Sequence, residues 1–274
     1  MKKLLRSDNW YLKSGAFITG FLIIVVIVSL FWTPYDPNYM DGAARLSAPS
    51  LTHIFGTDNF GRDIFSRVMG GLGTTFFTSF SINLIGAVVG TLFGSFAGYL
   101  GGVFDNTLMR ICDAITAFPN VMLALVIVAV LGSSDTNIIL ILGILFIPSY
   151  ARLVRSEFVR QKDLNYVKMA KLMGAGPSRV IFIHIMPNIY TTLLPALAIG
   201  FNNAVLAEAS MSFLGVGVSA NRPSLGRMLN ESQNFLISGK AWYAAFVGLA
   251  IVLLVMGLSL LGEGLQKETQ ERKR

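Results

Sequence analysis

Histidine and cysteine, two residue types often used in acid–base, nucleophilic and metal chemistry, are scarce in this sequence. Its 274 residues include two histidines, His53 and His184, and one cysteine, Cys112. One cysteine excludes a disulfide within the chain and a cysteine cluster for zinc or iron–sulfur. The histidines fall on opposite sides of the topology derived below, so they cannot share a metal, and each is better explained as a structural hydrogen-bonding residue. We expect no catalytic residue, no metal site and no cofactor bound by this chain.

A nucleotide-binding loop is also missing from the sequence. Gly15 and Gly20 have the spacing of the first two glycines in G-x-x-x-x-G-K-[ST], but Phe21 follows them and all three lie in an apolar run. Any ATP chemistry, with its Mg²⁺, would have to come from a partner.

One acid, Glu208, lies well away from any expected loop, near one end of an apolar run. A carboxylate near the bilayer centre costs at least about 2.5 kcal/mol, so Glu208 should face a polar cavity or a partner. Asn202 and Asn203 lie within about two helical turns of it. We expect these three residues to line a translocation pathway; the alternative is an internal hydrogen bond to neighbouring helices.

The composition indicates that lipid surrounds the elements that carry these residues. Apolar residues make up 53% of the chain, charged residues 14%, and the mean hydropathy is +0.62. A bilayer core of about 30 Å needs roughly 20 helical residues. We predict an all-α integral membrane protein with a single transmembrane domain over residues 15–274, after a cytoplasmic segment at 1–14. Its six predicted spans are 15–33, 76–100, 115–133, 136–155, 188–209 and 241–262.

Basic residues predict the orientation of these spans. With the N-terminus inside, 16 of the 22 Lys and Arg residues fall on the cytoplasmic side, seven of them in a long loop at 156–187 and at the end of the span before it. This bias places both termini in the cytoplasm. The net charge of +7 is thus a topology signal, and it gives no reason to expect nucleic acid as a partner.

Four glycines, Gly86, Gly90, Gly94 and Gly98, recur every fourth residue in the second predicted span. On a helix this spacing makes a smooth ridge that lets another backbone approach closely. We expect packing within the chain, with a subunit interface as the alternative.

The long cytoplasmic loop contains one short predicted helix, Leu164–Met173. Asp163 is expected to cap its start, and Gly174 with Pro177 to end it and open the next helix. A helix of under three turns is marginal in water, so it needs a surface to rest on.

The residues of this helix indicate which surface it needs. Met169, Leu172 and Met173 form one apolar face, and Lys168 and Lys171 flank it. The face could rest on lipid headgroups or in a groove of a cytoplasmic protein, and a rigid helix held in a groove can transmit a rotation.

Two charged groups invite a structural and a functional interpretation. On the outer side, Asp58, Arg62 and Asp63 lie within two helical turns, and they form either an exposed local ion-pair network or a docking site for another protein. On the inner side, Arg110 and Asp113 are spaced for a local structural pair, with an ATPase contact as the alternative.

Four segments resemble the ABC importer permeases. Residues 157–188 are similar to their EAA coupling loop, which reads E-A-A, three residues, glycine, nine residues, then I-x-L-P. Ala170, Gly174, Met186 and Pro187 match its register, whereas Lys168, Met169 and His184 replace its acid, first alanine and isoleucine. Residues 53–67, 98–119 and 209–217 are similar to further segments of the dipeptide, oligopeptide and nickel branch.

The resemblance implies two sets of site residues. The ATPase-coupling helix would comprise Val167, Lys168, Met169, Ala170, Lys171, Leu172, Met173 and Gly174, with Pro187 completing the motif. The outer signature segment would comprise Gly56, Thr57, Asp58, Gly61, Arg62 and Asp63.

The resemblance also implies the architecture and partners of a type I ABC importer permease, specifically the second permease subunit of its branch. The expected partners are a homologous permease that completes a heterodimer, two cytoplasmic ATPases that bind ATP and Mg²⁺, and an extracytoplasmic solute-binding protein in a bacterial or archaeal cell membrane. The expected substrates are di- or oligopeptides, and nickel or metal chelates are the alternative. A secondary transporter is a remote alternative, because neither an internal repeat nor ionisable residues in several spans is evident.

Overall fold

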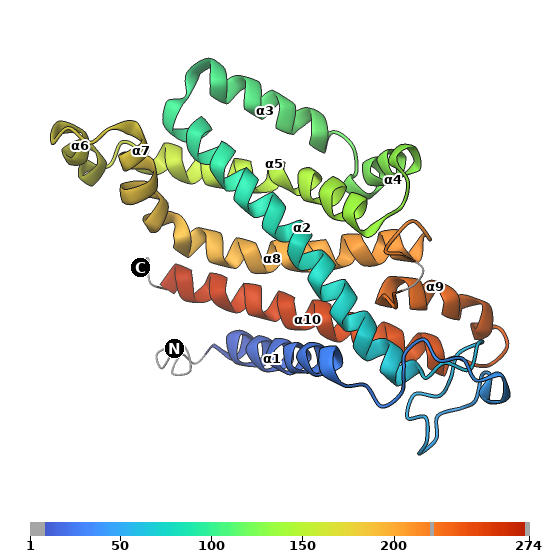
Figure 1. Ribbon diagram of the computed structural model, residues 1–274. Helices are drawn as coiled ribbons and strands as arrows, with labels where there is room; N and C mark the ends of the chain where they lie inside the picture. Colours follow the sequence, from blue (N-terminus) through green and yellow to red (C-terminus); the bar gives the residue numbers. More distant parts are fainter. Residues whose placement is uncertain (1–8, 220–221, 272–274) are drawn as a thin grey trace.

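The computed structural model describes residues 9–219 and 222–271, which form a bundle of long helices (Figure 1). A 3₁₀ turn at Gly42–Ala44 and a π-helical segment at Val180–Ile185, here η3, interrupt the α-helical pattern. The α-helices are α1 Trp10–Phe31, α2 Ile64–Leu100, α3 Gly102–Thr116, α4 Asn120–Leu131, α5 Asp135–Gln161, α6 Asn165–Leu172, α7 Pro177–Arg179, α8 Met186–Phe213, α9 Leu225–Leu236 and α10 Trp242–Glu271.

Among the described residues, five helical stretches are long and apolar enough to cross a membrane: α1, α2, α5, α10 and the continuous run from α7 through η3 to α8. The predicted third span, 115–133, is not one straight helix. It is replaced by α3 and α4, which meet at a bend of 84° and make a sixth span only if the pair is counted as one. Pro119 stands immediately before α4, where it has no N–H to continue the helix of α3.

Helix α2 packs along α5, and the glycine ridge makes this contact. A Cβ on Gly90 would lie 2.6 Å from Tyr150 Cβ and 2.7 Å from the Ile147 carbonyl oxygen; on Gly98 it would lie 2.5 Å from Phe158 Cβ. The two backbones are therefore closer than any larger side chain allows. Packing within the chain, as predicted for these glycines, is confirmed.

The two ends of the bundle carry different structures (Figure 1). Helix α6 projects at one end, where α1 begins and α10 finishes. The connection at 32–63 and helix α9 cover the opposite end. Between them, α10 packs against both α1 and α8.

Candidate functional site

The short helix α6 is held to the bundle by two small apolar side chains. Val167 and Ala170 are buried, and Val167 belongs to a core cluster with Phe158 of α5 and Ile181 of η3. The Tyr166 hydroxyl also donates a 2.7 Å hydrogen bond to Gln161 Oε1 at the end of α5. Partial burial raises the pKa of the Tyr166 phenol, so it remains a neutral donor at physiological pH.

The opposite face of α6 is not covered by any residue that the structure describes. Leu172 and Met173 are 83% and 84% exposed, and Met169 is also exposed. Lys168 is exposed beside this face, whereas the Lys171 ammonium lies 5.1 Å from the centre of the Tyr99 ring. This arrangement is the one-sided apolar face that the sequence predicts.

The C-terminal end of α6 agrees with the prediction, whereas its N-terminal end does not. Gly174 has φ +85°, a conformation that glycine adopts without a Cβ clash, and Pro177 opens α7. The prediction that Asp163 caps the start of the helix is wrong. Leu164 occupies the N-cap position, no side chain caps the helix, and the helix runs from Asn165 to Leu172.

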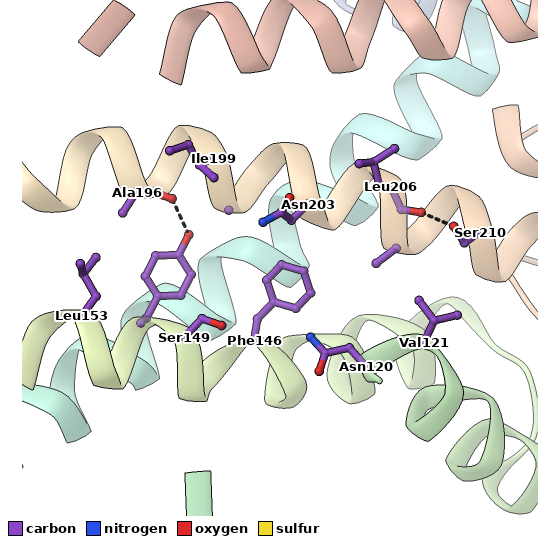
Figure 2. Close-up of a pocket in the computed structure, with 13 residues that line it drawn as sticks. Asn120, Val121, Phe146, Ser149, Leu153, Ala196, Ile199, Asn203, Leu206 and Ser210 are labelled. Carbon is purple, nitrogen blue, oxygen red and sulfur yellow. Dashed lines mark hydrogen bonds between the residues drawn. The ribbon is translucent and has the colours of Figure 1, made fainter. Parts of the chain in front are cut away.

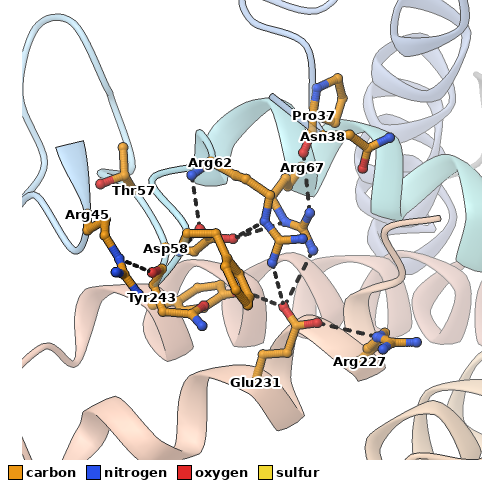
Figure 3. A network of polar contacts seen from close by, with 12 residues as sticks. Pro37, Asn38, Arg45, Thr57, Asp58, Arg62, Arg67, Arg227, Glu231 and Tyr243 are labelled. Atoms are coloured by element: carbon orange, nitrogen blue, oxygen red, sulfur yellow. Dashed lines mark hydrogen bonds and ion pairs between the residues drawn. The ribbon is translucent and has the colours of Figure 1, made fainter. Parts of the chain in front are cut away.

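At the other end of the molecule, Asp58 is fully buried at the centre of a charged network (Figure 3). Its Oδ1 accepts hydrogen bonds from the backbone N–H groups of Phe60 and Arg62, and its Oδ2 lies 2.6 Å from Arg62 Nε. Arg67 Nε stands 3.6 Å from the same carboxylate oxygen.

Glu231 of α9 joins both arginines of this network. Its Oε2 lies 3.3 Å from Arg62 Nη2 and 3.4 Å from Arg67 Nη2, and it accepts a 3.2 Å hydrogen bond from the Tyr243 hydroxyl. Arg227 approaches the other carboxylate oxygen at 3.3 Å. The network thus fastens the segment before α2 to α9 and α10.

The rest of the outer signature segment shapes the backbone around this network. Asp63 caps α2 by accepting a 2.8 Å hydrogen bond from the Ser66 N–H, and it also pairs with His53 Nδ1 at 2.9 Å. Gly56 and Gly61 have positive φ values of 75° and 78°, and Thr57 is fully buried. The predicted local ion pair between Asp58 and Arg62 is present, but the expectation that it is exposed is wrong, because both side chains are buried.

The network contains residues that the sequence did not single out. Arg67, Glu231 and Tyr243 come from three different elements, and more than 160 residues separate Glu231 from Arg62 and from Arg67. Sequence spacing carries no signal for such a long-range pairing.

The inner charged residues pair between helices. Asp113 lies 3.2 Å from Arg152 Nη1 and makes no pair with Arg110 in the described part of the chain, so the predicted local pair is wrong. Asp105 accepts two hydrogen bonds from Arg155, one from Nε and one of 2.6 Å from Nη2. Both pairs join α3 to α5.

A pocket with a volume of about 510 Å³ opens between α4, α5 and α8 (Figure 2). Asn203, Asn120, Ser149 and Ser210 supply polar groups to a lining that is otherwise largely apolar. At its floor, the Tyr150 hydroxyl donates to Asn83 Oδ1 at 2.5 Å. Polar residues in the apolar run of α5 were the available sequence signal for Ser149 and Tyr150.

Of the three residues expected to line a pathway, Asn203 alone lines this pocket. Asn202 turns toward α10 and donates a 3.1 Å hydrogen bond to Ser259 Oγ. Glu208 is fully buried, and its Oε1 accepts a 2.7 Å hydrogen bond from Ser212 Oγ. This hydrogen bond lies within α8, whereas the alternative to a pathway position was a hydrogen bond to neighbouring helices.

The helices, the pocket and the exposed short helix describe a multi-pass membrane component of a transport system. Residues 90–273 match the family model described as binding-protein-dependent transport system inner membrane component. The chain belongs to this family, as the resemblance predicted. It is a permease subunit of an ABC importer.

Curated relatives extend the match over most of the chain. It is 36% identical over 255 residues to the dipeptide transport system permease protein DppC of Haemophilus influenzae, covering 90% of this chain and 86% of that protein. It is 39% identical over 250 residues to the glutathione transport system permease protein GsiD of Escherichia coli O157:H7, covering 90% and 82%.

A solved structure shares the fold. An inward-facing conformation of the MetNI methionine ABC transporter matches with a TM-score of 0.56 and 21% identity, over 74% of this chain and 94% of that chain.

Proposed function

We propose that this permease subunit imports small peptides delivered by an extracytoplasmic binding protein. Relatives named for dipeptide and glutathione transport, each aligned over 90% of the chain, support this substrate class. The pocket is consistent with it, because backbone-like amides and hydroxyls at Asn203, Asn120 and Ser149 can hydrogen-bond a peptide while the apolar lining accepts varied side chains.

The proposed complex contains a homologous second permease, two cytoplasmic ATPases that hold ATP and Mg²⁺, and the binding protein. The pocket supports the second permease, since it is an open surface of this chain and a facing subunit would close it. In the proposed topology both termini and α6 are cytoplasmic, which agrees with the basic residues and with the position of α6 at the end of the bundle where α1 begins and α10 finishes (Figure 1).

The observation that carries the coupling mechanism is the uncovered apolar face of α6. Met169, Leu172 and Met173 would seat in a groove of an ATPase, while Val167 and Ala170 keep the helix attached to η3 and α5. ATP-driven movement of the groove would turn α6 as a rigid unit and pass the motion to α8, which lines the pocket.

The test is Leu172→Asp in the reconstituted complex. We expect loss of ATPase co-purification and of binding-protein-stimulated ATP hydrolysis, because a carboxylate cannot be desolvated in an apolar groove. Membrane insertion should be normal, since Leu172 is exposed. Ser178→Asp adds the same charge at an exposed position on α7, outside the coupling helix; it is the matched control and should retain both properties. Normal co-purification of the ATPases with the Leu172→Asp variant would refute the assignment.

The substrate class has its own test. Mass spectrometry of the ligand retained on the co-encoded binding protein should identify short peptides, and retention of a metal chelate instead would contradict the peptide proposal.

A further inference from the structure

A second hollow, of about 560 Å³, lies between α3 and α5. Asn106, Met109, Arg110 and Asp113 of α3 line one side of it, and Arg152 and Arg155 of α5 line the other. It shares no lining residue with the pocket between α4, α5 and α8, and the transport mechanism proposed above does not use it.

The hollow carries more positive charge than its acids neutralise. Arg155 is committed to Asp105 through two nitrogens. Arg152 uses one nitrogen to reach Asp113, and this pair is open to solvent, with side chains 42% and 67% exposed. Arg110 is exposed and has no ion-pair or hydrogen-bond partner in the described part of the chain. Donors from Arg110, Arg152 and the Asn106 amide are thus available to an anion.

The position of the hollow along α5 matches the depth of lipid phosphates. Helix α5 begins at Asp135, and about 30 Å of helix separates this residue from Arg155 at roughly 1.5 Å per residue. This length equals the hydrocarbon thickness of a bilayer, about 30 Å. Arg152 and Arg155 therefore lie at the membrane surface, on the α6 side.

Helix α3 also offers a hydrocarbon surface beside the arginines. Val103, Phe104 and Ile111 are exposed. At about 100° per residue they occupy the sector of the helix next to the one that carries Asn106 and Arg110. If the phosphate of a lipid were held at the hollow, its acyl chains could contact this apolar sector. A soluble phosphate has no acyl chains and would gain no contact there.

We propose that the hollow between α3 and α5 binds the phosphodiester headgroup of an anionic phospholipid. Arg110 and Arg152 hold the phosphate, Asn106 donates to the headgroup, and the acyl chains follow the exposed apolar side of α3. Basic pockets between membrane helices near the cytoplasmic surface are suited to such headgroups. Arg155, already neutralised by Asp105, keeps the two helices together and leaves the site open.

The test measures lipid retention on the full-length protein with its co-purified partners. The complex is placed in nanodiscs of one part palmitoyl-oleoyl phosphatidylglycerol to three parts of the corresponding phosphatidylcholine, extracted, and analysed by native mass spectrometry. The variant Arg110→Gln with Arg152→Gln should retain less phosphatidylglycerol, by about fivefold for each arginine removed. Arg179→Gln, an exposed arginine on α7 outside the hollow, is the matched control and should retain the unmodified amount.

A variant that is expected to increase lipid retention distinguishes loss of the site from misfolding of the protein. Asp113→Asn frees Arg152 from its acid, and retention should rise about twofold or more, which a destabilised protein could not produce. Equal retention by all variants, or an equal loss from Arg179→Gln, would overturn the proposal. So would full displacement of the lipid by glycerol 3-phosphate at equal concentration, since this would show a site for phosphate alone.

Discussion

The two ends of this molecule are built on opposite principles. At the α6 end, a short helix is attached by two small buried side chains, and its leucine and methionine side chains are exposed on the protein surface. At the opposite end, Asp58, Arg62 and Arg67 are buried and form ion pairs with one another and with Glu231. In the described part of the chain, the apolar face of the first surface is uncovered, whereas the charged side chains of the second are buried and paired.

This difference separates the roles of the two ends. Buried ion pairs hold one geometry, because removing either member leaves an uncompensated charge. A small amphipathic helix has little stability of its own and takes its position from whatever covers it. A mutation at the satisfied end should therefore change stability first, and a mutation at the exposed end should change coupling first.

The largest effect on stability is expected from Asp58→Asn. The substitution leaves Arg62 and Arg67 with reduced compensation in a buried site, at a cost of about 3 kcal/mol or more in unfolding free energy. Thermal unfolding of the purified protein in detergent measures this cost. Asp36→Asn, at an exposed turn on the same side, should change it by less than about 0.5 kcal/mol. Equal stability of the two variants would show that the network does not fasten this end.

Gly90→Ala tests the helix contact that joins the two ends. The added Cβ would meet Tyr150 Cβ at 2.6 Å and the Ile147 carbonyl oxygen at 2.7 Å, so α2 and α5 must move apart, at a cost of about 1–3 kcal/mol. Gly20→Ala on α1 has no atom within 4 Å of the new Cβ and should be neutral or stabilising. If both variants unfold at the same temperature, the close approach of α2 and α5 is not required.

Gly174→Ala should lower the unfolding free energy less than the two preceding substitutions do, and it should lower the transport rate. Its φ of +85° is strained for alanine by about 1 kcal/mol, and no neighbouring atom opposes the Cβ. We expect the tilt of α6 to change, so that substrate uptake into proteoliposomes falls further than the amount of folded protein does. Uptake equal to that of the unmodified protein would remove this turn from the coupling mechanism.

The smallest effect is expected from a comparison of one exposed and one buried position in α8, Asn203 and Glu208. In a Cys112→Ser background, Asn203→Cys should react with a membrane-impermeant thiol reagent, because Asn203 is exposed and lines the pocket. Glu208→Cys should remain unlabelled, because Glu208 is fully buried. Labelling of position 208 in any state trapped during ATP hydrolysis would show that its surroundings open. It would then support the original prediction that Glu208 lines the translocation pathway.

The features that the sequence predicted are those encoded within a few neighbouring residues. Hydropathy located the long helices, the apolar face of α6 followed from Met169, Leu172 and Met173, and the turn after it followed from Gly174. Each depends on local periodicity or on one residue's backbone preference. The glycine ridge of α2 was predicted equally well, since close packing needs the absence of side chains on one face.

The features that the sequence did not predict depend on contacts between distant segments or on competition between local signals. Glu231 reaches Arg62 and Arg67 across the folded chain, and the burial of Glu208 depends on the helices packed around α8. The bend between α3 and α4 had a local signal in Pro119, but the continuous hydropathy of residues 115–133 outweighed it.

The π-helical segment Val180–Ile185 determines where a one-residue deletion would be tolerated. A π-turn closes its hydrogen bonds over five residues where an α-turn uses four, so the segment accommodates one more residue than an α-helix of equal height. Deleting one residue there can convert the segment to α-helix and leave α8 facing the same way. A deletion inside α8 itself would instead rotate everything beyond it by about 100° and carry Asn203 away from the pocket. A one-residue deletion between Val180 and Ile185 is therefore expected to disturb the pocket less than a deletion inside α8, at the expense of the fixed spacing between Gly174 and Pro187.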